Sequence, residues 1–325
     1  MKNLVMGLVK GYSFEQLRPF VASLRSTGYS GDICFFYSDL TKSTLRSLAK
    51  YDVELISFRM PSINAYIKRM QPYAILNHLY TSPLNTFNTI NRLFPWLVTL
   101  LSRSNKVSKC RLAANFLNVY CVRFPLYYTY LARNKDKYAN VMITDVRDVI
   151  FQRDPFEFDI EEDLALFLED GRTLIKNCPI NSGWLKKGFG EPVLRQIGGN
   201  PISCSGVTFA KYDAMMLYLE QMVDQLLRLR FHGHGIDQGV HNYILYTDRL
   251  NGVRVFENGH GPVLTMGRTT DMPVVFDVNG FVVNDDGSVA HVLHQYDRHI
   301  DAGTLSFEVS NDRVRLTYAG SAACA

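Results

Sequence analysis

The stretch VMITDVRDVIFQRDPF, residues Val141 to Phe156, decides how this sequence is interpreted. The run from Val141 to Ile143 is apolar, which is typical of a buried strand. Two acidic residues, Asp145 and Asp148, follow it directly. Ligands of open α/β sheets bind at the carboxyl ends of the strands. We therefore expect these two carboxylates at a binding edge.

Two carboxylates held close together repel each other, and one takes up a proton unless a cation stands between them. A hard divalent ion removes this repulsion and can also bind a diphosphate. Asp145 and Asp148 are therefore candidate ligands of Mn²⁺ or Mg²⁺, and Arg147 can pair with a carboxylate or a phosphate. The structural alternative is a strand cap at Asp145, a turn at Asp148 and a surface ion pair at Arg147. Asp154 and the proline after it predict a turn.

The first 59 residues predict a β-α-β-α-β unit. Apolar runs at LVMGLV, DICFFYSD and VELISF predict strands, and the segments between them have helical spacing. Ser13 is suited to cap the first helix and Gly28 to end it. This alternation is typical of a parallel sheet covered by helices.

Further along the chain the pattern changes twice. Residues 60–109 combine prolines with aromatic, Asn-rich and basic segments, which predicts an insertion of short helices and loops. The insertion either packs on the sheet or contacts a membrane surface through residues 93–106, as a peripheral interaction. In residues 110–303 we expect one helix over 111–133, bent near Pro125, then a strand at LALFLE and a strand or turn at ISCSGVTFA, among further helices. Residues 304–325 predict a β-hairpin and tail, within a single domain of residues 1–325.

Composition excludes several classes of protein. The chain has 325 residues, is 47% hydrophobic and 20% charged, and has a net charge of +4. It has neither a long basic run nor a zinc-finger or RNP pattern, so we expect no nucleic-acid partner. The six cysteines form no CxxC pair, and the sequence has no signal peptide, glycosylation sequon or apolar run long enough to span a bilayer. We expect a cytoplasmic chain.

Two later segments hold candidate site residues. In HVLHQYDRH, His294 is a candidate metal ligand because a neutral imidazole suits Mn²⁺, while Arg298 and His299 could neutralise a leaving diphosphate. The alternative there is a polar loop with surface histidines. In FHGHGIDQGVH the histidine spacing fits no standard zinc site. Asp237 is either the N-cap of a helix or a cleft residue beside Gln238.

Three more residues could contact a ligand. SCSGVTF lacks the Gly-x-Ser-x-Gly of a nucleophile elbow, so Cys204 is expected to be a buried, unreactive side chain. Ser205 and Gly206 allow a ligand to approach the backbone closely. Arg123, on the helix before the acidic strand, could reach phosphates or form an ion pair on the helix surface.

Together these segments resemble a known family. A strand followed by Asp-x-x-Asp and DPF resembles the DxD region of GT-A glycosyltransferases, in a D-x-R-D form. The opening strand–helix–strand resembles their nucleotide-binding half, and CSGVTFA resembles the segment that borders the donor sugar. GIDQGVHN is similar to the DQ-x-x-x-N helix start of several retaining families, and HQYDRH to the late His motif that completes the metal site. These likenesses occur in the family's order along the chain.

The resemblance implies an α/β, Rossmann-like GT-A fold, with a mixed sheet flanked by helices, and a metal-dependent transferase. The donor would be a nucleotide-diphosphate sugar, most simply a UDP-sugar, and the acceptor a glycan or lipid-linked glycan. The nucleotide would lie near Gly7, Val9 and Tyr12, with Asp237 and Gln238 near the anomeric carbon, and the DQ start favours retention. Two alternatives stay open: a sugar-nucleotidyltransferase or phosphoesterase, and a non-catalytic module that binds nucleotide sugars.

Overall fold

The computed structural model describes residues 1–59, 100, 105–115, 117–158, 161–229, 233–310 and 313–319. The insertion expected at 60–109, including most of the membrane-contact segment 93–106, and the end of the tail lie outside the described residues. Among the helices that are described, none combines the length and hydrophobicity needed to cross a membrane.

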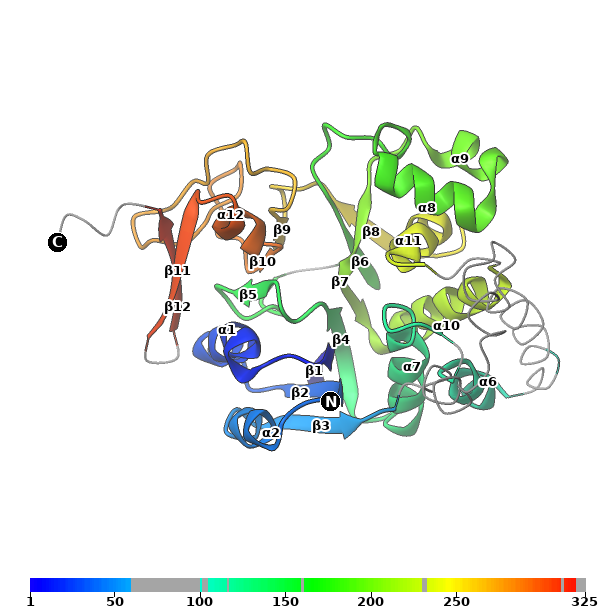
Figure 1. Ribbon diagram of the computed structural model, residues 1–325, viewed down its shortest axis with the longest axis horizontal. Helices are drawn as coiled ribbons and strands as arrows, with labels where there is room; N and C mark the ends of the chain where they lie inside the picture. The colour runs from blue at the N-terminus through cyan, green and yellow to red at the C-terminus, as the bar shows by residue number, and fades with distance from the viewer. Residues whose placement is uncertain are drawn as a thin grey trace, which may run out of the picture.

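A central sheet runs through the molecule (Figure 1). Its strands are β1 (Lys2–Lys10), β2 (Asp32–Ser38), β3 (Val53–Ser57), β4 (Tyr138–Thr144), β6 (Leu164–Leu168), β7 (Ser203–Lys211) and β8 (Val253–Phe256). Over the described residues the order is β3-β2-β1-β4-β7-β6-β8. The first four strands in this order are parallel, whereas β7 is antiparallel to both of its neighbours. The expected mixed sheet flanked by helices is confirmed.

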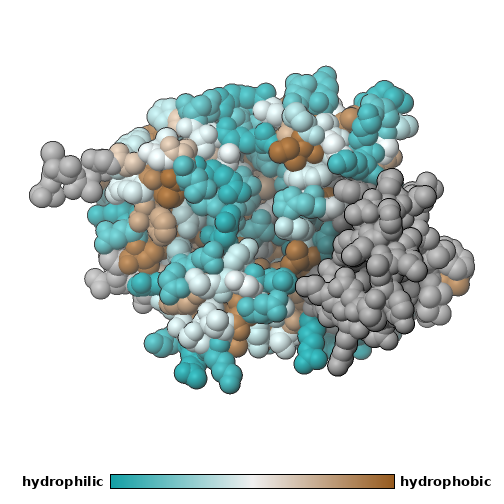
Figure 2. Space-filling view, viewed as in Figure 1, coloured by the Kyte–Doolittle hydropathy of each residue, from teal (hydrophilic) through white to brown (hydrophobic). Residues whose placement is uncertain are grey.

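Helices cover both faces of this sheet. The described helices are α1 (Phe14–Ser26), α2 (Lys42–Ala49), α6 (Lys106–Ala113), α7 (Arg123–Arg133), α8 (Pro179–Phe189), α9 (Glu191–Ile197), α10 (Tyr212–Arg228), α11 (Ile236–Tyr246) and α12 (Asp297–Asp301), with a short 3₁₀ turn at Ile175–Asn177. Side chains alternate along β1, so Val5 packs with Phe20 of α1 while Leu4 packs in the other core layer with Phe124 of α7. Figure 2 shows mostly hydrophilic side chains on the face turned to the viewer, with hydrophobic residues in small separate groups.

The ends of α1 lie where the sequence predicts them. Ser13 forms a capping box in which its own N–H donates to the Gln16 side chain at 3.0 Å. Gly28 follows the last turn with a φ of +90°, a conformation that only glycine adopts at little cost.

The single helix expected over 111–133 is wrong, because two helices, α6 and α7, occupy this region. Between them the Asn118 side chain accepts hydrogen bonds from the backbone N–H groups of Tyr120 and Cys121, each at 3.0 Å, which stabilises a turn. Pro125 lies in the first turn of α7, where a missing N–H costs nothing. The proline therefore helps to start a helix instead of bending one.

Two smaller sheets complete the fold. Strands β5 (Val149–Phe151), β9 (Val263–Thr265) and β10 (Val292–His294) form the order β5-β10-β9, and β10 pairs antiparallel with β5 so that His294 lies opposite Val149. The predicted C-terminal hairpin is confirmed as β11 (Leu305–Ser310) and β12 (Arg313–Tyr318). The three-residue strands position the site, because they carry residues near the end of the chain to the edge of β4.

Candidate metal and ligand site

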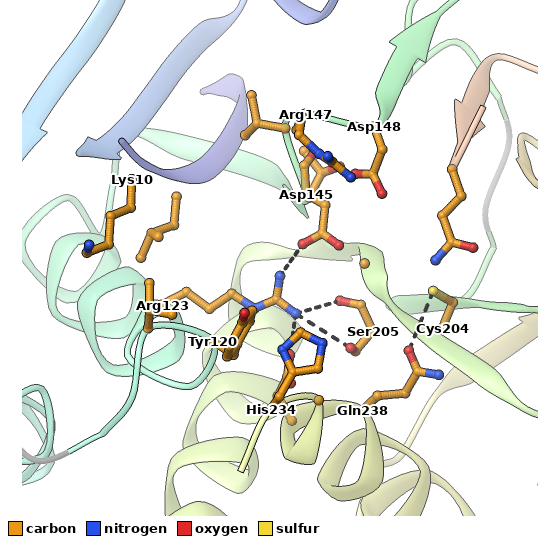
Figure 3. Close-up of a pocket in the computed structure, with 18 of the residues that line it drawn as sticks. Lys10, Tyr120, Arg123, Asp145, Arg147, Asp148, Cys204, Ser205, His234 and Gln238 are labelled. Carbon is orange, nitrogen blue, oxygen red and sulfur yellow. Dashed lines mark hydrogen bonds and ion pairs between the residues drawn. The ribbon is translucent and has the colours of Figure 1, made fainter. Parts of the chain in front are cut away.

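A pocket of about 490 Å³ opens at the carboxyl ends of β1 and β4 (Figure 3). The beginning of β7 and the first turns of α7 and α11 complete its walls. The volume lies within the range of small-molecule sites. A binding edge at the end of β4 is what the opening stretch of sequence predicts.

Asp145, Asp148 and His294 meet at this edge, and each offers a ligand atom within 4.8 Å of the others. Backbone hydrogen bonds fix two of them: the Asp145 N–H donates to the Gly206 carbonyl, and the Asp148 carbonyl accepts from the Gln295 N–H, both at 2.7 Å. Pairing of β10 with β5 places His294 beside the two aspartates. Within the described ranges, these residues form the one such group of three or more His, Cys, Asp or Glu side chains.

The donor set fits a divalent cation. Nε2 of His294 is fully buried, has no hydrogen-bond partner, and lies 3.8 Å from Asp145 Oδ2. A buried polar atom without a partner is costly, so it points to a missing ligand. Two carboxylates with one imidazole are ligands that Mn²⁺-type ions accept. The three residues could therefore hold Mn²⁺ or Mg²⁺.

Gly206 is required by this arrangement. A Cβ atom at this position would lie 2.4 Å from His294 Cε1, 2.6 Å from its Nε2 and 2.9 Å from Asp145 Oδ2. Any larger residue would displace the imidazole or the carboxylate. The sequence suggested Gly206 as a point of close backbone approach to a ligand, and here it makes room for two candidate metal ligands.

The two acids differ in their electrostatic surroundings. Burial alone would raise the pKa of Asp145, but the positive charge of Arg123 and the nearby His294 ring outweigh it and lower this pKa below its ordinary value. Burial raises the pKa of Asp148. Among the described residues, Asp148 has no ion pair. The pair is therefore one stabilised carboxylate beside one that lacks a counter-charge.

Arg123 joins three elements at the bottom of the pocket. Its side chain is 12% exposed and donates to Asp145 Oδ1 at 2.5 Å, to Asp237 Oδ2 at 2.8 Å and to the Ser205 carbonyl at 3.2 Å (Figure 3). Burial opposes its charge, but Asp145 and then Asp237 raise its pKa overall. Arg123 thus lines the pocket with its donors directed to carboxylates, and its contact with a phosphate stays a prediction.

Asp237 and Gln238 lie in the first turn of α11, and both line the pocket. The alternative that Asp237 is the N-cap is wrong, because Gly235 occupies that position with a φ of +73°. The Asp237 carboxylate instead pairs with Arg123, and burial raises its pKa. Cys204 is buried, and burial raises the pKa of its thiol, as expected of an unreactive cysteine.

Of the remaining basic candidates, one lines the pocket and two do not. Arg147 lines the pocket and donates to Asp297 at 2.9 Å. Arg298 is not among the lining residues and pairs with the same Asp297 at 3.1 Å. His299 is fully buried, with Nδ1 3.1 Å from Thr304 Oγ1, so the role of neutralising a diphosphate does not fit its position. Its ring joins α12 to the segment that follows it.

The structure separates the three residues expected at the nucleotide. Tyr12 lines the pocket. Val9 is fully buried in the core, and a Cβ at Gly7 would meet Val146 at 2.3 Å. Lys10, one position from Val9, lines the pocket instead. A charged residue at the end of an apolar strand was the signal in the sequence for it.

The sequence did not predict an aromatic group that lines one wall of the pocket. Tyr120 stacks edge-to-face on His234 with ring centroids 4.4 Å apart, and Trp184 of α8 lies against Gly235. Tyr120 and His234 lie in the loops before α7 and α11, next to positions that the sequence does identify. Such side chains can stack on rings of a ligand.

No family model matches this chain, and no curated protein is significantly similar to it in sequence. Solved structures align with it at low identity. Core-mannan synthase A from Aspergillus fumigatus, in a Mn/GDP form, is 14% identical with a TM-score of 0.39 over 79% of this chain and 73% of its own. Galactosyltransferase LgtC with donor and acceptor sugar analogues is 11% identical with a TM-score of 0.45, and an active-site mutant of LgtC is 9% identical with 0.44. Both of these cover 90% of this chain and 87% of their own.

Proposed function

We propose that this chain is a metal-dependent glycosyltransferase of the GT-A type. In this proposal it transfers a sugar from a nucleotide-diphosphate sugar, a UDP-sugar by preference, to a glycan or lipid-linked glycan. Retention at the anomeric carbon follows from the DQ helix start.

One observation carries the proposal. The unpartnered Nε2 of His294 converges with Asp145 and Asp148 at the carboxyl edge of a parallel strand, inside a pocket of about 490 Å³. This combination suits a ligand that brings its own negative charges and is bound together with a divalent ion. A nucleotide diphosphate has that chemistry, and the pocket's polar walls suit a sugar beyond it.

Each side chain has a role in this scheme. Asp145, Asp148 and His294 would hold Mn²⁺ or Mg²⁺, which when bound supplies positive charge to the departing diphosphate. Lys10 and Arg147 line the same pocket and can neutralise phosphate oxygens.

Two further groups would position the reactants. Arg123 pairs with both Asp145 and Asp237 and so fixes their relative positions. It would thereby hold the metal ligands at a fixed distance from the residues beside the sugar. Asp237 and Gln238 would then contact sugar hydroxyls beside the reacting carbon. Such fixed dipoles and charges act without reorganisation during reaction.

The test is a thermal-shift screen of nucleotide sugars with Mn²⁺, with Mg²⁺ and with EDTA, since a ligand that binds only the folded state raises its melting temperature. We expect the largest rise for a UDP-sugar with Mn²⁺ and none with EDTA. Incubation of that sugar nucleotide with glycan acceptors should then release UDP together with a glycosylated product.

The products separate this proposal from its rivals. Release of pyrophosphate or inorganic phosphate would identify a nucleotidyltransferase or phosphoesterase instead. Binding without turnover across a broad acceptor panel would favour a non-catalytic module. Absence of any metal-dependent nucleotide binding would overturn the proposed function altogether.

A further inference from the structure

The side-chain amide of Gln238 has a defined orientation in the pocket. Its Nε2 donates to Glu169 Oε1 at 2.9 Å and to Asn181 Oδ1 at 3.0 Å. Its Oε1 lies on the other side, 3.8 Å from the sulfur of Cys204 (Figure 3). Both amide hydrogens therefore form hydrogen bonds behind the pocket wall. The carbonyl oxygen is the end of the amide that faces the pocket.

This orientation is imposed by chemistry. An amide nitrogen and oxygen look alike in shape, so only their partners decide which way the group points. Glu169 directly follows Leu168, the last residue of β6, and its side chain is 5% exposed. Its other oxygen accepts a hydrogen bond from Arg268 Nε at 2.6 Å. A guanidinium can only donate, and an ionised carboxylate can only accept. Gln238 must therefore turn its NH₂ group toward Glu169.

Asn181 gives the same answer independently. Its Nδ2 faces the sulfur of Cys178 at 3.3 Å, which leaves Oδ1 for Gln238. The sulfur itself accepts from Arg268 at 3.0 Å. Asn181 is 3% exposed, so water does not compete for these contacts. Two buried acceptors on different elements thus hold the same amide end.

We propose that Glu169, held by Arg268 and assisted by Asn181, is a positioning residue that presents the Gln238 carbonyl oxygen to the sugar of the donor. This inference rests on the proposed function and deepens it. A carbonyl oxygen in the pocket accepts from a sugar hydroxyl and favours positive charge that develops at the anomeric carbon. An NH₂ group in the same place would oppose that charge, so the orientation matters for the rate.

Glu169→Gln tests the orientation with almost no change of shape. Arg268 can only donate, so the new amide must turn its carbonyl to Arg268 and its NH₂ to Gln238. Two donors then face each other, and rotation of the Gln238 amide relieves the conflict by turning NH₂ into the pocket. We expect kcat to fall roughly tenfold or more, with an unchanged Kd for UDP with Mn²⁺.

Glu54→Gln is the matched control. It removes one carboxylate charge from an exposed position on β3, where Glu54 accepts from Tyr130 at 2.6 Å and does not line the pocket. Its kcat should equal that of the parent. If Glu169→Gln does not fold, Asn181→Leu, which removes one of the two acceptors at similar volume, should lower kcat with the same unchanged Kd for UDP and Mn²⁺.

Three results would overturn the inference: an unchanged kcat in Glu169→Gln, a fall in kcat matched by an equal loss of UDP affinity, or a similar fall in Glu54→Gln. If the parent transfers no sugar, the proposed function fails by itself. The amide orientation is then judged by binding. A weaker affinity of Glu169→Gln for UDP-sugar but not for UDP would support it, and equal changes for both ligands would refute it.

Discussion

Two clusters of charged side chains lie at opposite ends of the central sheet, and their charges are balanced differently. At the amino ends of β1, β2 and β4, Asp32 accepts from Lys2 and Lys137, each at 2.8 Å, and from Tyr138 at 3.1 Å. At the carboxyl ends, Asp145 and Asp237 share Arg123.

The comparison separates a structural cluster from a candidate functional one. The amino-end cluster contains its own counter-charges, and hydrogen bonds satisfy its acid from several strands. Among the described residues, the carboxyl-end cluster leaves Asp148 without an ion pair and His294 Nε2 without a hydrogen-bond partner. A cluster that the protein does not neutralise itself is suited to a charged ligand.

The largest effect is expected from Asp148→Asn. It should abolish Mn²⁺-dependent UDP binding and lower transfer by roughly two orders of magnitude or more. Because burial raises the pKa of Asp148, loss of this charge should leave the melting temperature in EDTA unchanged or higher. Titration calorimetry and thermal unfolding measure both, and retained Mn²⁺-dependent binding would contradict the metal assignment.

Asp237→Asn should have the next largest effect. The asparagine carbonyl can still accept from Arg123, so the melting temperature should change little. The carboxylate charge beside the sugar is lost, and the initial transfer rate should fall more than about tenfold, or about 1.4 kcal/mol of activation free energy. A rate within about twofold of the parent would return Asp237 to a purely structural role.

A buried histidine behind the pocket sharpens the contrast between satisfied and unsatisfied groups. His241 has both ring nitrogens occupied at 2.8 Å, by Ser203 and Tyr218, and burial lowers its pKa from 6.5 to about 3. The folded state therefore resists a proton that the unfolded state takes up below pH 6.5. Stability should be complete above this pH and fall, by up to about 1.4 kcal/mol per pH unit, as the pH drops toward 3.

Denaturant titrations from pH 7 to pH 4 measure this slope. His241→Gln, which cannot be protonated, should show a shallower fall than the parent, whatever its stability at pH 7. Equal slopes for the two proteins would show that other groups cause the loss of stability at low pH.

The smallest effect is expected from Asp32→Asn, the counterpart of Asp148→Asn at the other end of the sheet. Burial would raise the pKa of Asp32, but hydrogen bonds from Lys137 and Lys2 lower it to about 2. Its contribution to stability is present above the ordinary pKa of 3.8 and is lost as the pH falls toward 2. The variant should lose about 1 kcal/mol of unfolding free energy at pH 7, and less as the pH falls.

Transfer by Asp32→Asn should match that of the parent. Chemical denaturation at several pH values checks the stability, and initial rates check the activity. A large loss of transfer at unchanged stability would remove the distinction between the two clusters.

The sequence allowed prediction of those parts of the fold that have long, regular patterns. The apolar runs of β1, β2 and β3 and the helical spacing of α1 and α10 bury enough surface to show in a window of ten residues. Strands β5, β9 and β10 have three residues each, which is too short for any period to appear. Helix α8 is likewise weakly amphipathic and was not anticipated.

The same reasoning explains the outcome for the site. Asp145 and Asp148 could be found because they follow a buried strand, and its end defines a binding edge. Glu169 was hidden as the last residue of an apolar run. Asn181 belongs to the unanticipated α8, so nothing in the sequence placed it beside Gln238. Contacts between residues this far apart along the chain depend on topology that local pattern does not contain.

The pairing of β10 with β5 also affects the order in which the protein can assemble. Asp145 and His294 are separated by roughly 150 residues, and the loop between them includes β6, β7 and β8. During synthesis the two carboxylates leave the ribosome long before the imidazole does. A nascent chain can therefore complete its central sheet before it is able to bind a metal, and the ion can join only after β10 has been synthesised.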